Sequence, residues 1–218
     1  MNNQADKVMQ DQIDCNDAFD TAMFSHIALS LSGGGIRAVG FHLGTLDLLE
    51  RMDLLKNVNI LSTVSGGSLV GTAYALSAQE NGDQRFEKCF YNLYDFLPEL
   101  NTLEDILQNI TGDKPASPSG RRDLISGMAN VFHERFYSRY YRSTQFGVFW
   151  DGQHNHLREI MFNATEFRTG NAFRFQKSRY PCRIGNGEVW IEEEHAKKMR
   201  MGDIMASSCC IPVGMEPF

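Results

Sequence analysis

Two apolar runs, each followed by glycines and then by a helical pattern, are the feature that most constrains the fold of this chain. Residues 27–35 read Ile-Ala-Leu-Ser-Leu-Ser-Gly-Gly-Gly, and residues 59–67 read Asn-Ile-Leu-Ser-Thr-Val-Ser-Gly-Gly. Apolar residues then recur at helical spacing over residues 37–52 and 68–77. Short apolar strands that alternate with helices are typical of a parallel sheet. The sequence therefore predicts an α/β fold, with both glycine turns at the same edge of adjacent parallel strands.

The rest of the chain continues this pattern less regularly. The elements expected there are strands at 159–164 and 172–176 with a turn at 168–170, helices at 86–97, 103–110, 123–142 and 202–210, and a loop at 111–120. Residues 1–24 are acidic and polar, and we interpret them as a lead-in that lies outside the core.

Composition and charge narrow the class of protein. Hydrophobic residues make up 42% and charged residues 22% of the 218 residues, which excludes a disordered chain and a coiled coil. The net charge of −6 argues against a dedicated nucleic-acid binder, because such domains are usually basic. No apolar run approaches the roughly 20 residues that span a bilayer, and the acidic N-terminus lacks the features of a signal peptide. We therefore expect a cytoplasmic protein.

The cysteines and histidines indicate no metal site. The five cysteines are Cys15, Cys89, Cys182, Cys209 and Cys210. Their number is odd and no C-x-x-C pair occurs, so neither a disulfide framework nor a zinc site is suggested. His154 and His156 form an H-x-H pair without a nearby acidic or thiol partner, and we interpret them as solvated loop residues. No metal and no cofactor is expected.

The strongest local signal is Ser65, which lies between an expected strand and an expected helix. A serine on such a sharp turn projects its hydroxyl above the sheet, beside the free N–H groups of the helix N-terminus. The glycines after it let the backbone turn tightly and leave the hydroxyl uncovered. This is the arrangement of a nucleophile elbow, although Thr63 stands where the G-x-S-x-G pattern has its first glycine. The alternative is that Ser65 only caps a helix.

The first glycine turn, Gly33-Gly34-Gly35, allows three interpretations. A Walker loop requires G-K-[ST] at its end, and Ile36-Arg37 does not supply it. A dinucleotide-binding turn fits the glycine spacing, but the second strand ends without the carboxylate that binds the ribose. The third interpretation is an oxyanion hole, in which glycine N–H groups face a nucleophile on the neighbouring strand. We favour the oxyanion hole because it explains both turns with one site.

Four segments together resemble the patatin-like phospholipase family. They are, in the order of that family, residues 31–38 (Leu-Ser-Gly-Gly-Gly-Ile-Arg-Ala), residues 62–68 (Ser-Thr-Val-Ser-Gly-Gly-Ser), residues 162–166 (Phe-Asn-Ala-Thr-Glu) with Thr169-Gly170, and residues 205–212 (Met-Ala-Ser-Ser-Cys-Cys-Ile-Pro). The resemblance covers about residues 27–212. No single motif is decisive, but the ordered set is specific.

This resemblance implies a doubly wound α/β fold, with a mainly parallel sheet flanked by helices, related to that of cytosolic phospholipase A2. It also implies hydrolysis of acyl esters in phospholipids or related lipids by a Ser–Asp dyad without a histidine, a metal or a nucleotide. By the same resemblance, the nucleophile is Ser65, its elbow is formed with Val64, Gly66 and Gly67, and the oxyanion hole is formed by the N–H groups of Gly33, Gly34 and Gly35 beside the basic residue Arg37.

This sequence departs from the family's pattern at the catalytic aspartate. In the family it lies in an Asp-Gly turn shortly after the Ile-Pro segment, and no such turn precedes Phe218. Asp151 and Gly152 form the only Asp-Gly pair, but the pair stands before the strand at 159–164, and we interpret it as an ordinary surface turn. Asp203 is expected to open a helix. We therefore interpret residues 25–218 as a patatin-like domain truncated before its Asp-Gly turn. The base is expected beyond Phe218, and residues 1–218 alone are expected to have little or no esterase activity.

Two other functions remain as alternatives. A non-catalytic lipid-binding or regulatory module of the same fold would leave Ser65 inert, and a nucleotide-binding turn at residues 33–37 is the weaker option. The expected partner is membrane phospholipid or another lipid ester, with peripheral membrane contact left open and no nucleic acid. The oligomeric state is not indicated by the sequence.

Arginines and aromatic residues alternate over residues 121–150, and this segment also has more than one interpretation. Such a composition suits a helix on an anionic membrane, but it equally suits helices that bury aromatic rings and point arginines outward. We favour packing over membrane binding, and both over RNA binding. His26 and His42 flank the glycine turn, and we interpret both as packing or hydrogen-bonding residues.

Overall fold

The computed structural model describes residues 24–79, 85–100, 102–112, 120–142, 144–151, 156–180 and 183–211. The polar lead-in expected at residues 1–24 lies outside these ranges, apart from Phe24. Most of the loop expected at 111–120 also lies outside them, as do Gly152 and His154.

Among the described residues, six strands form one mixed sheet in sequence order. They are β1 (Ile27–Leu31), β2 (Val58–Val64), β3 (Glu159–Thr165), β4 (Ala172–Lys177), β5 (Ile184–Gly185) and β6 (Trp190–Ile191). Strands β1, β2 and β3 are parallel to one another, whereas β3, β4, β5 and β6 pair antiparallel. The expected α/β fold is confirmed, and the strands expected at 159–164 and 172–176 are confirmed as β3 and β4.

The helices follow the expected pattern closely. They are α2 (Gly35–Arg51), α3 (Gly66–Gln79), α4 (Arg85–Phe96), α5 (Thr102–Thr111), α6 (Leu124–Val131), α7 (Ser138–Tyr140), α8 (Val148–Asp151), α9 (Glu193–Ala196) and α10 (Met201–Cys209). The single helix expected at 123–142 is instead built from α6, a π-helical segment Phe132–Tyr137 and α7. The short elements β5, β6, α8 and α9 were not expected from the sequence.

Helix α3 occupies the centre of the fold. Every residue from Gly66 to Ala78 is buried, because the helix is packed on the sheet and surrounded by α2, α4 and α10. A helix covered on all sides carries small and apolar residues all round, which is why α3 shows no strong apolar stripe. The core thus extends directly beneath the turn that contains Ser65.

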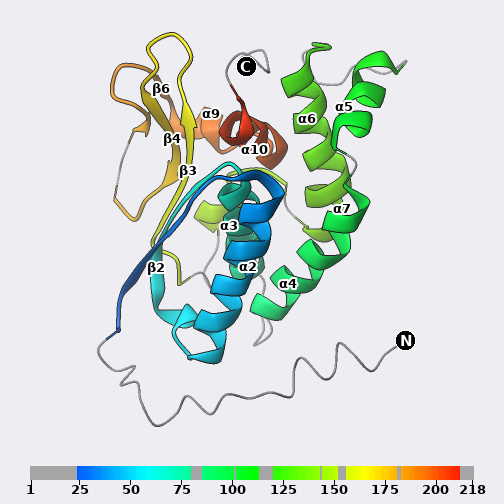
Figure 1. The fold of residues 1–218 in the computed structure, drawn as a ribbon. Coiled ribbons are helices and arrows are strands. Elements are labelled where there is room, and N and C mark those ends of the chain that lie inside the picture. Colours follow the sequence, from blue (N-terminus) through cyan, green and yellow to red (C-terminus); the bar gives the residue numbers. More distant parts are fainter. Residues whose placement is uncertain are drawn as a thin grey trace, which may run out of the picture.

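The crossover helices lie on one face of the strands, as Figure 1 shows. This follows from the order β1-β2-β3, because right-handed crossovers that advance in one direction all place their helices on the same side. On the opposite face, Ala28 and Ser30 are exposed and Ile60 and Val64 are each 37% exposed. This face of β1 and β2 is therefore largely uncovered within the described residues.

The segment rich in arginine and aromatic residues is a packed part of the fold. Its rings are mostly buried, among them Phe132, Phe136, Tyr137, Phe146 and Phe149. Its arginines point outward to acidic partners on other helices. Arg135 pairs with Asp105 of α5 at 2.5 Å, and Arg139 pairs with Glu99 at 2.5 Å. These contacts agree with the packing interpretation.

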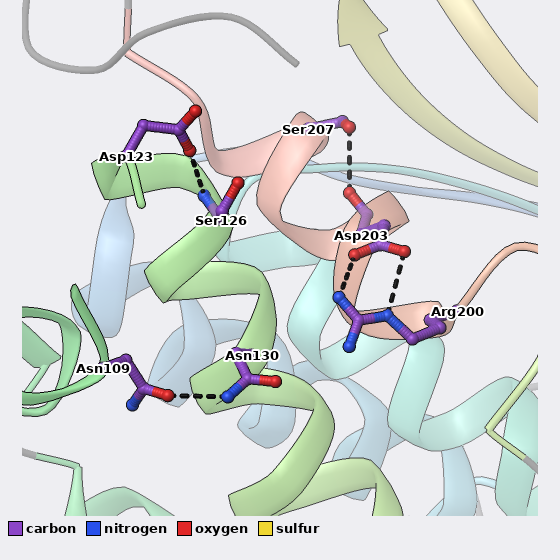
Figure 2. Close-up of polar contacts among 7 residues, drawn as sticks. All are labelled: Asn109, Asp123, Ser126, Asn130, Arg200, Asp203 and Ser207. Atoms are coloured by element: carbon purple, nitrogen blue, oxygen red, sulfur yellow. Dashed lines mark hydrogen bonds and ion pairs between the residues drawn. The ribbon is translucent and has the colours of Figure 1, made fainter. Parts of the chain in front are cut away.

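Figure 2 shows one polar contact that caps α6 and another that joins α6 to α5. The Asp123 carboxylate accepts from the Ser126 N–H at 2.9 Å and so caps α6. The Asn130 amide of α6 donates to Asn109 of α5 at 2.6 Å.

No helix in the described part of the chain has the length and apolar character that a membrane span requires.

Candidate active site

The two glycine turns meet above the sheet. Strands β1 and β2 are parallel with Leu31 opposite Thr63, so the chain leaves both strands at the same edge. A Cβ atom built on Gly33 would lie 3.1 Å from Ser65 Cβ and 3.8 Å from Ser65 Oγ. The first turn is therefore in van der Waals contact with the serine of the second. The convergence expected from the sequence is observed.

Ser65 has an unusual backbone conformation. Its φ of 54° lies in the left-handed region, which non-glycine residues adopt rarely and at a cost of about 1–3 kcal/mol. Its carbonyl accepts from the Ser68 N–H at 2.8 Å and so begins α3. Its hydroxyl, by contrast, shares a hydrogen bond with the Cys209 thiol of α10. The helix thus starts from the Ser65 backbone, while the side chain is turned toward another element.

The close approach of the two turns explains the glycines after Ser65. A Cβ atom on Gly66 would lie 2.4 Å from the Gly35 carbonyl oxygen, and one on Gly67 would lie 2.3 Å from the Leu31 carbonyl oxygen. Both distances are far shorter than any van der Waals contact, so a side chain at either position would push the turns apart. Gly66 and Gly67 therefore permit the elbow to pack against the first turn.

Thr63, which stands where the elbow pattern has glycine, fits into space left by another glycine. A Cβ atom on Gly71 of α3 would lie 2.3 Å from the Thr63 Cγ2 methyl group. The buried Thr63 hydroxyl lies 2.9 Å from Ser68 Oγ, which satisfies it inside the protein. The threonine is accommodated without moving the strand.

Polar contacts join the elbow to α10 and β3. The Ser65 N–H donates to Ser208 Oγ at 2.9 Å, and Ser208 Oγ donates to the Asn163 carbonyl oxygen of β3 at 2.7 Å. Burial raises the pKa of the Cys209 thiol to about 12, and the hydrogen bond with Ser65 only partly offsets this. Cys209 is therefore a neutral thiol at physiological pH and not a nucleophile.

These contacts were not found by sequence reasoning, although Ser208 and Cys209 lie in the Met205–Pro212 segment that resembles the family. Ser65 and Ser208 are 143 positions apart in the chain. A run of small residues on a buried helix was the available signal, but it does not say which side chain reaches the elbow.

The remaining expected site residues lie in the first glycine turn and just after it. Gly33, Gly34 and Gly35 are exposed, and Arg37 is exposed in the first turn of α2. His42 is buried and donates from Nε2 to the Ser32 carbonyl oxygen at 2.8 Å, so it fastens the residue that precedes the glycine turn.

Two other histidines that the sequence analysis considered, His26 and His156, also form hydrogen bonds. His26 Nδ1 lies 2.6 Å from Asn59 Oδ1, so the hydrogen-bonding roles expected for His26 and His42 are confirmed. His156 was expected to be a solvated loop residue, but that expectation is wrong. Its Nε2 lies 2.8 Å from the buried Tyr74 hydroxyl.

Asp203 forms an ion pair with Arg200 of the same segment. It lies in the first turn of α10, as expected, and its two oxygens contact Arg200 Nη2 at 2.6 Å and Nε at 3.1 Å (Figure 2). Five residues of helix, about 8 Å, separate it from Ser208. Among the described residues, the side-chain partners of Ser65 are Ser208 and Cys209, and neither is a carboxylate. In the same ranges no three histidine, cysteine or acidic side chains gather into a metal site.

A family model matches most of the chain. The family model described as "Patatin-like phospholipase" matches residues 29–218, which include both glycine turns, β3 and α10. No significant match to a curated protein or to a solved structure was found.

Proposed function

Because the chain belongs to the patatin-like phospholipase family, a family of lipid acyl hydrolases, we propose that it cleaves acyl esters of phospholipids or related lipids with Ser65 as the nucleophile. The observation that carries this proposal is the position of Ser65. It has a left-handed backbone on a turn between β2 and α3, and Gly33 lies against its side chain. Strained residues of this kind cluster at active sites.

In the proposed reaction, Ser65 Oγ attacks the ester carbonyl carbon while its proton passes to an aspartate base. The negative charge that develops on the carbonyl oxygen is held by the N–H groups of Gly33, Gly34 and Gly35, with Arg37 as the nearby cation. The tetrahedral intermediate then releases the alcohol product, which takes the proton, and an acyl-enzyme remains. Water hydrolyses the acyl-enzyme to a fatty acid and restores Ser65. The described residues do not supply the aspartate.

Exposed apolar side chains that adjoin the glycine turns and α10 in the sequence support a lipid as the substrate. Ile36 directly follows Gly35 and is 58% exposed, Val64 directly precedes Ser65 and is 37% exposed, and Ile211 is 65% exposed just beyond α10. We call these three residues the apolar rim. Large exposed apolar side chains next to a polar site suit contact with acyl chains or with a lipid surface.

The location follows the same proposal. Cys89 and Cys209 are reduced thiols, which is typical of a cytoplasmic protein. We therefore propose a cytoplasmic location, with peripheral contact to membranes through the apolar rim. Flotation of the full-length protein with lipid vesicles measures this contact.

The nucleophile is tested with a fluorophosphonate probe and a p-nitrophenyl ester on the full-length protein. We expect a covalent adduct on Ser65, and we expect Ser65→Ala to abolish both labelling and hydrolysis. Ser30→Ala is the matched control, because Ser30 is an exposed serine on β1. An adduct on another residue, or undiminished hydrolysis by Ser65→Ala, would refute the assignment.

A non-catalytic lipid-binding module is the second candidate function. It is favoured by the absence of a carboxylate among the described side-chain partners of Ser65, because an unassisted serine hydroxyl is a weak nucleophile. The same experiment separates the two candidates. Binding to vesicles without any adduct on Ser65 identifies the binding module.

A further inference from the structure

We propose that Ser208 is a positioning residue, which holds the backbone of Ser65 in its left-handed conformation from the end of α10. This inference rests on the proposed role of Ser65 as the nucleophile. It goes beyond that role because it assigns a function to a side chain that takes no part in the bond changes.

The Ser208 hydroxyl is the centre of a buried polar cluster. Ser208 Oγ lies 2.9 Å from Ser65 N, 2.8 Å from Ser68 Oγ and 2.7 Å from the Asn163 carbonyl oxygen. Ser208 is 6% exposed and Ser68 is fully buried, so water does not compete freely for these contacts. One oxygen on α10 thus touches the elbow, the first turn of α3 and the end of β3.

The direction of each hydrogen bond follows from counting protons. A carbonyl oxygen only accepts, so the Ser208 hydroxyl donates its single proton to the Asn163 carbonyl oxygen. Its two lone pairs then accept from the Ser65 N–H and from the Ser68 hydroxyl. Ser68 has no second proton, so it accepts from Thr63 Oγ1 at 2.9 Å. The single Thr63 proton is then not available to the Met161 carbonyl oxygen, which lies farther away at 3.3 Å. The chain of donors runs one way, from Thr63 through Ser68 and Ser208 to Asn163, and it saturates Ser208.

A second tie fixes the strand end that carries the elbow. The Asn163 amide donates to the Thr63 carbonyl oxygen at 2.9 Å and to Ser62 Oγ at 3.0 Å. Asn163 therefore binds β2 with its side chain and Ser208 with its backbone. Because β3 and α10 are held together at this point, the oxygen of Ser208 has a defined position from which to hold the Ser65 N–H.

Loss of this oxygen has a specific consequence for the nucleophile. Without it, the Ser65 N–H has no partner among the described residues, and the residue is free to relax from a strained conformation. Relaxation would move Oγ relative to the glycine turn. The apolar rim is formed by other residues, so binding of the acyl chain is not expected to change. The effect should therefore appear in kcat and in the reactivity of Ser65, while KM stays nearly constant.

The test compares Ser208→Ala with Ser207→Ala in the full-length protein. Ser207 is the matched control, because its hydroxyl donates only to the Asp203 carbonyl oxygen of its own helix at 2.9 Å (Figure 2). We expect Ser208→Ala to lower kcat and the fluorophosphonate labelling rate of Ser65 tenfold or more, with KM changed less than twofold. Amide exchange at Ser65 should also accelerate at least tenfold. Ser207→Ala should match the wild type in every readout.

Ser208→Thr keeps the oxygen and is expected to restore most of the labelling rate. If Ser208→Ala does not fold, Ser208→Cys replaces the oxygen with a weaker acceptor at similar volume and should show the same loss. The proposal is overturned if Ser208→Ala behaves like Ser207→Ala, or if Ser208→Thr is as impaired as Ser208→Ala. Amide exchange at Ser65 needs no catalysis. If wild-type Ser65 forms no adduct, the proposed function fails, while exchange still decides whether Ser208 holds the backbone.

Discussion

Gly33→Ala tests the idea that the first turn holds the reacting oxygen of the substrate over Ser65. The added methyl group would lie 3.1 Å from Ser65 Cβ, 3.8 Å from Ser65 Oγ and 3.7 Å from the Val64 carbonyl oxygen. The φ of Gly33 is outside the left-handed region, so alanine causes no backbone strain. The substitution therefore changes the space above the serine and little else.

The expected change in stability is small because two effects oppose each other. Carbon atoms pack best about 3.5–4.0 Å apart, so a contact at 3.1 Å requires a shift of a few tenths of an ångström and costs about 1 kcal/mol at an exposed turn. Replacing glycine by alanine at a permitted φ recovers about 0.4–1 kcal/mol from the unfolded state. The net free energy of unfolding should change by less than about 1 kcal/mol, or roughly 2–4 °C in Tm.

The expected change in activity is large. Loss of one oxyanion donor lowers the rate by about 10²–10³-fold, and a displaced turn loses part of that effect. We expect kcat/KM of the full-length protein for a p-nitrophenyl ester to fall roughly 10- to 100-fold, which is about 1.4–2.7 kcal/mol of transition-state stabilisation.

Gly40→Ala on α2 is the control, because a Cβ atom there has nothing within 4 Å. It should leave activity unchanged and raise stability by about 0.5–1 kcal/mol. Full activity of Gly33→Ala at an unchanged Tm would refute the reasoning, since it would show that the turn does not act on the substrate.

Two further substitutions test the apolar rim and the packing of the helices. Ile36→Ser should weaken hydrolysis of vesicle lipid about fivefold, which is about 1 kcal/mol of lost apolar contact, and leave a soluble short-chain ester unaffected. Leu48→Ser is its control on the far part of the same helix, and an equal effect of both would exclude a rim. Arg135→Ala leaves a buried carboxylate unpaired, so calorimetry should show a loss of about 1.5–3 kcal/mol, or roughly 3–12 °C in Tm. Arg139→Ala removes an exposed pair and should leave Tm unchanged, and equal losses would contradict the burial argument.

The sequence predicted correctly those parts of the fold that are indicated by patterns of neighbouring residues. Strands β1 and β2 are short apolar runs that stop at glycine, and α2 and α3 follow them with helical spacing. Strands β3 and β4 and the turn at 168–170 between them were also predicted, and the two strands pair antiparallel in the structure. The two-residue strands β5 and β6 are too short to show a period, and they exist because neighbouring strand edges supply their hydrogen bonds.

The π-helical segment could not be predicted from the local sequence either. Residues 132–137 lie inside a stretch with helical periodicity, and the sequence predicted one continuous helix there. The observed change in hydrogen bonding coincides with the burial of Phe132, Phe136 and Tyr137 in one short segment. Packing of large rings against α10 depends on tertiary structure, and no local pattern encodes it.

By itself the sequence determined β1, α2, β2 and α3, the two glycine turns and the serine between β2 and α3, because each depends on residues that are neighbours in the chain. Only the tertiary structure decided what surrounds that serine. Ser208 and Cys209 reach it from 143 and 144 positions away, and which atoms meet there depends on how α10 packs between β3 and α6. Packing is cooperative and long-range, so no window of the sequence contains it.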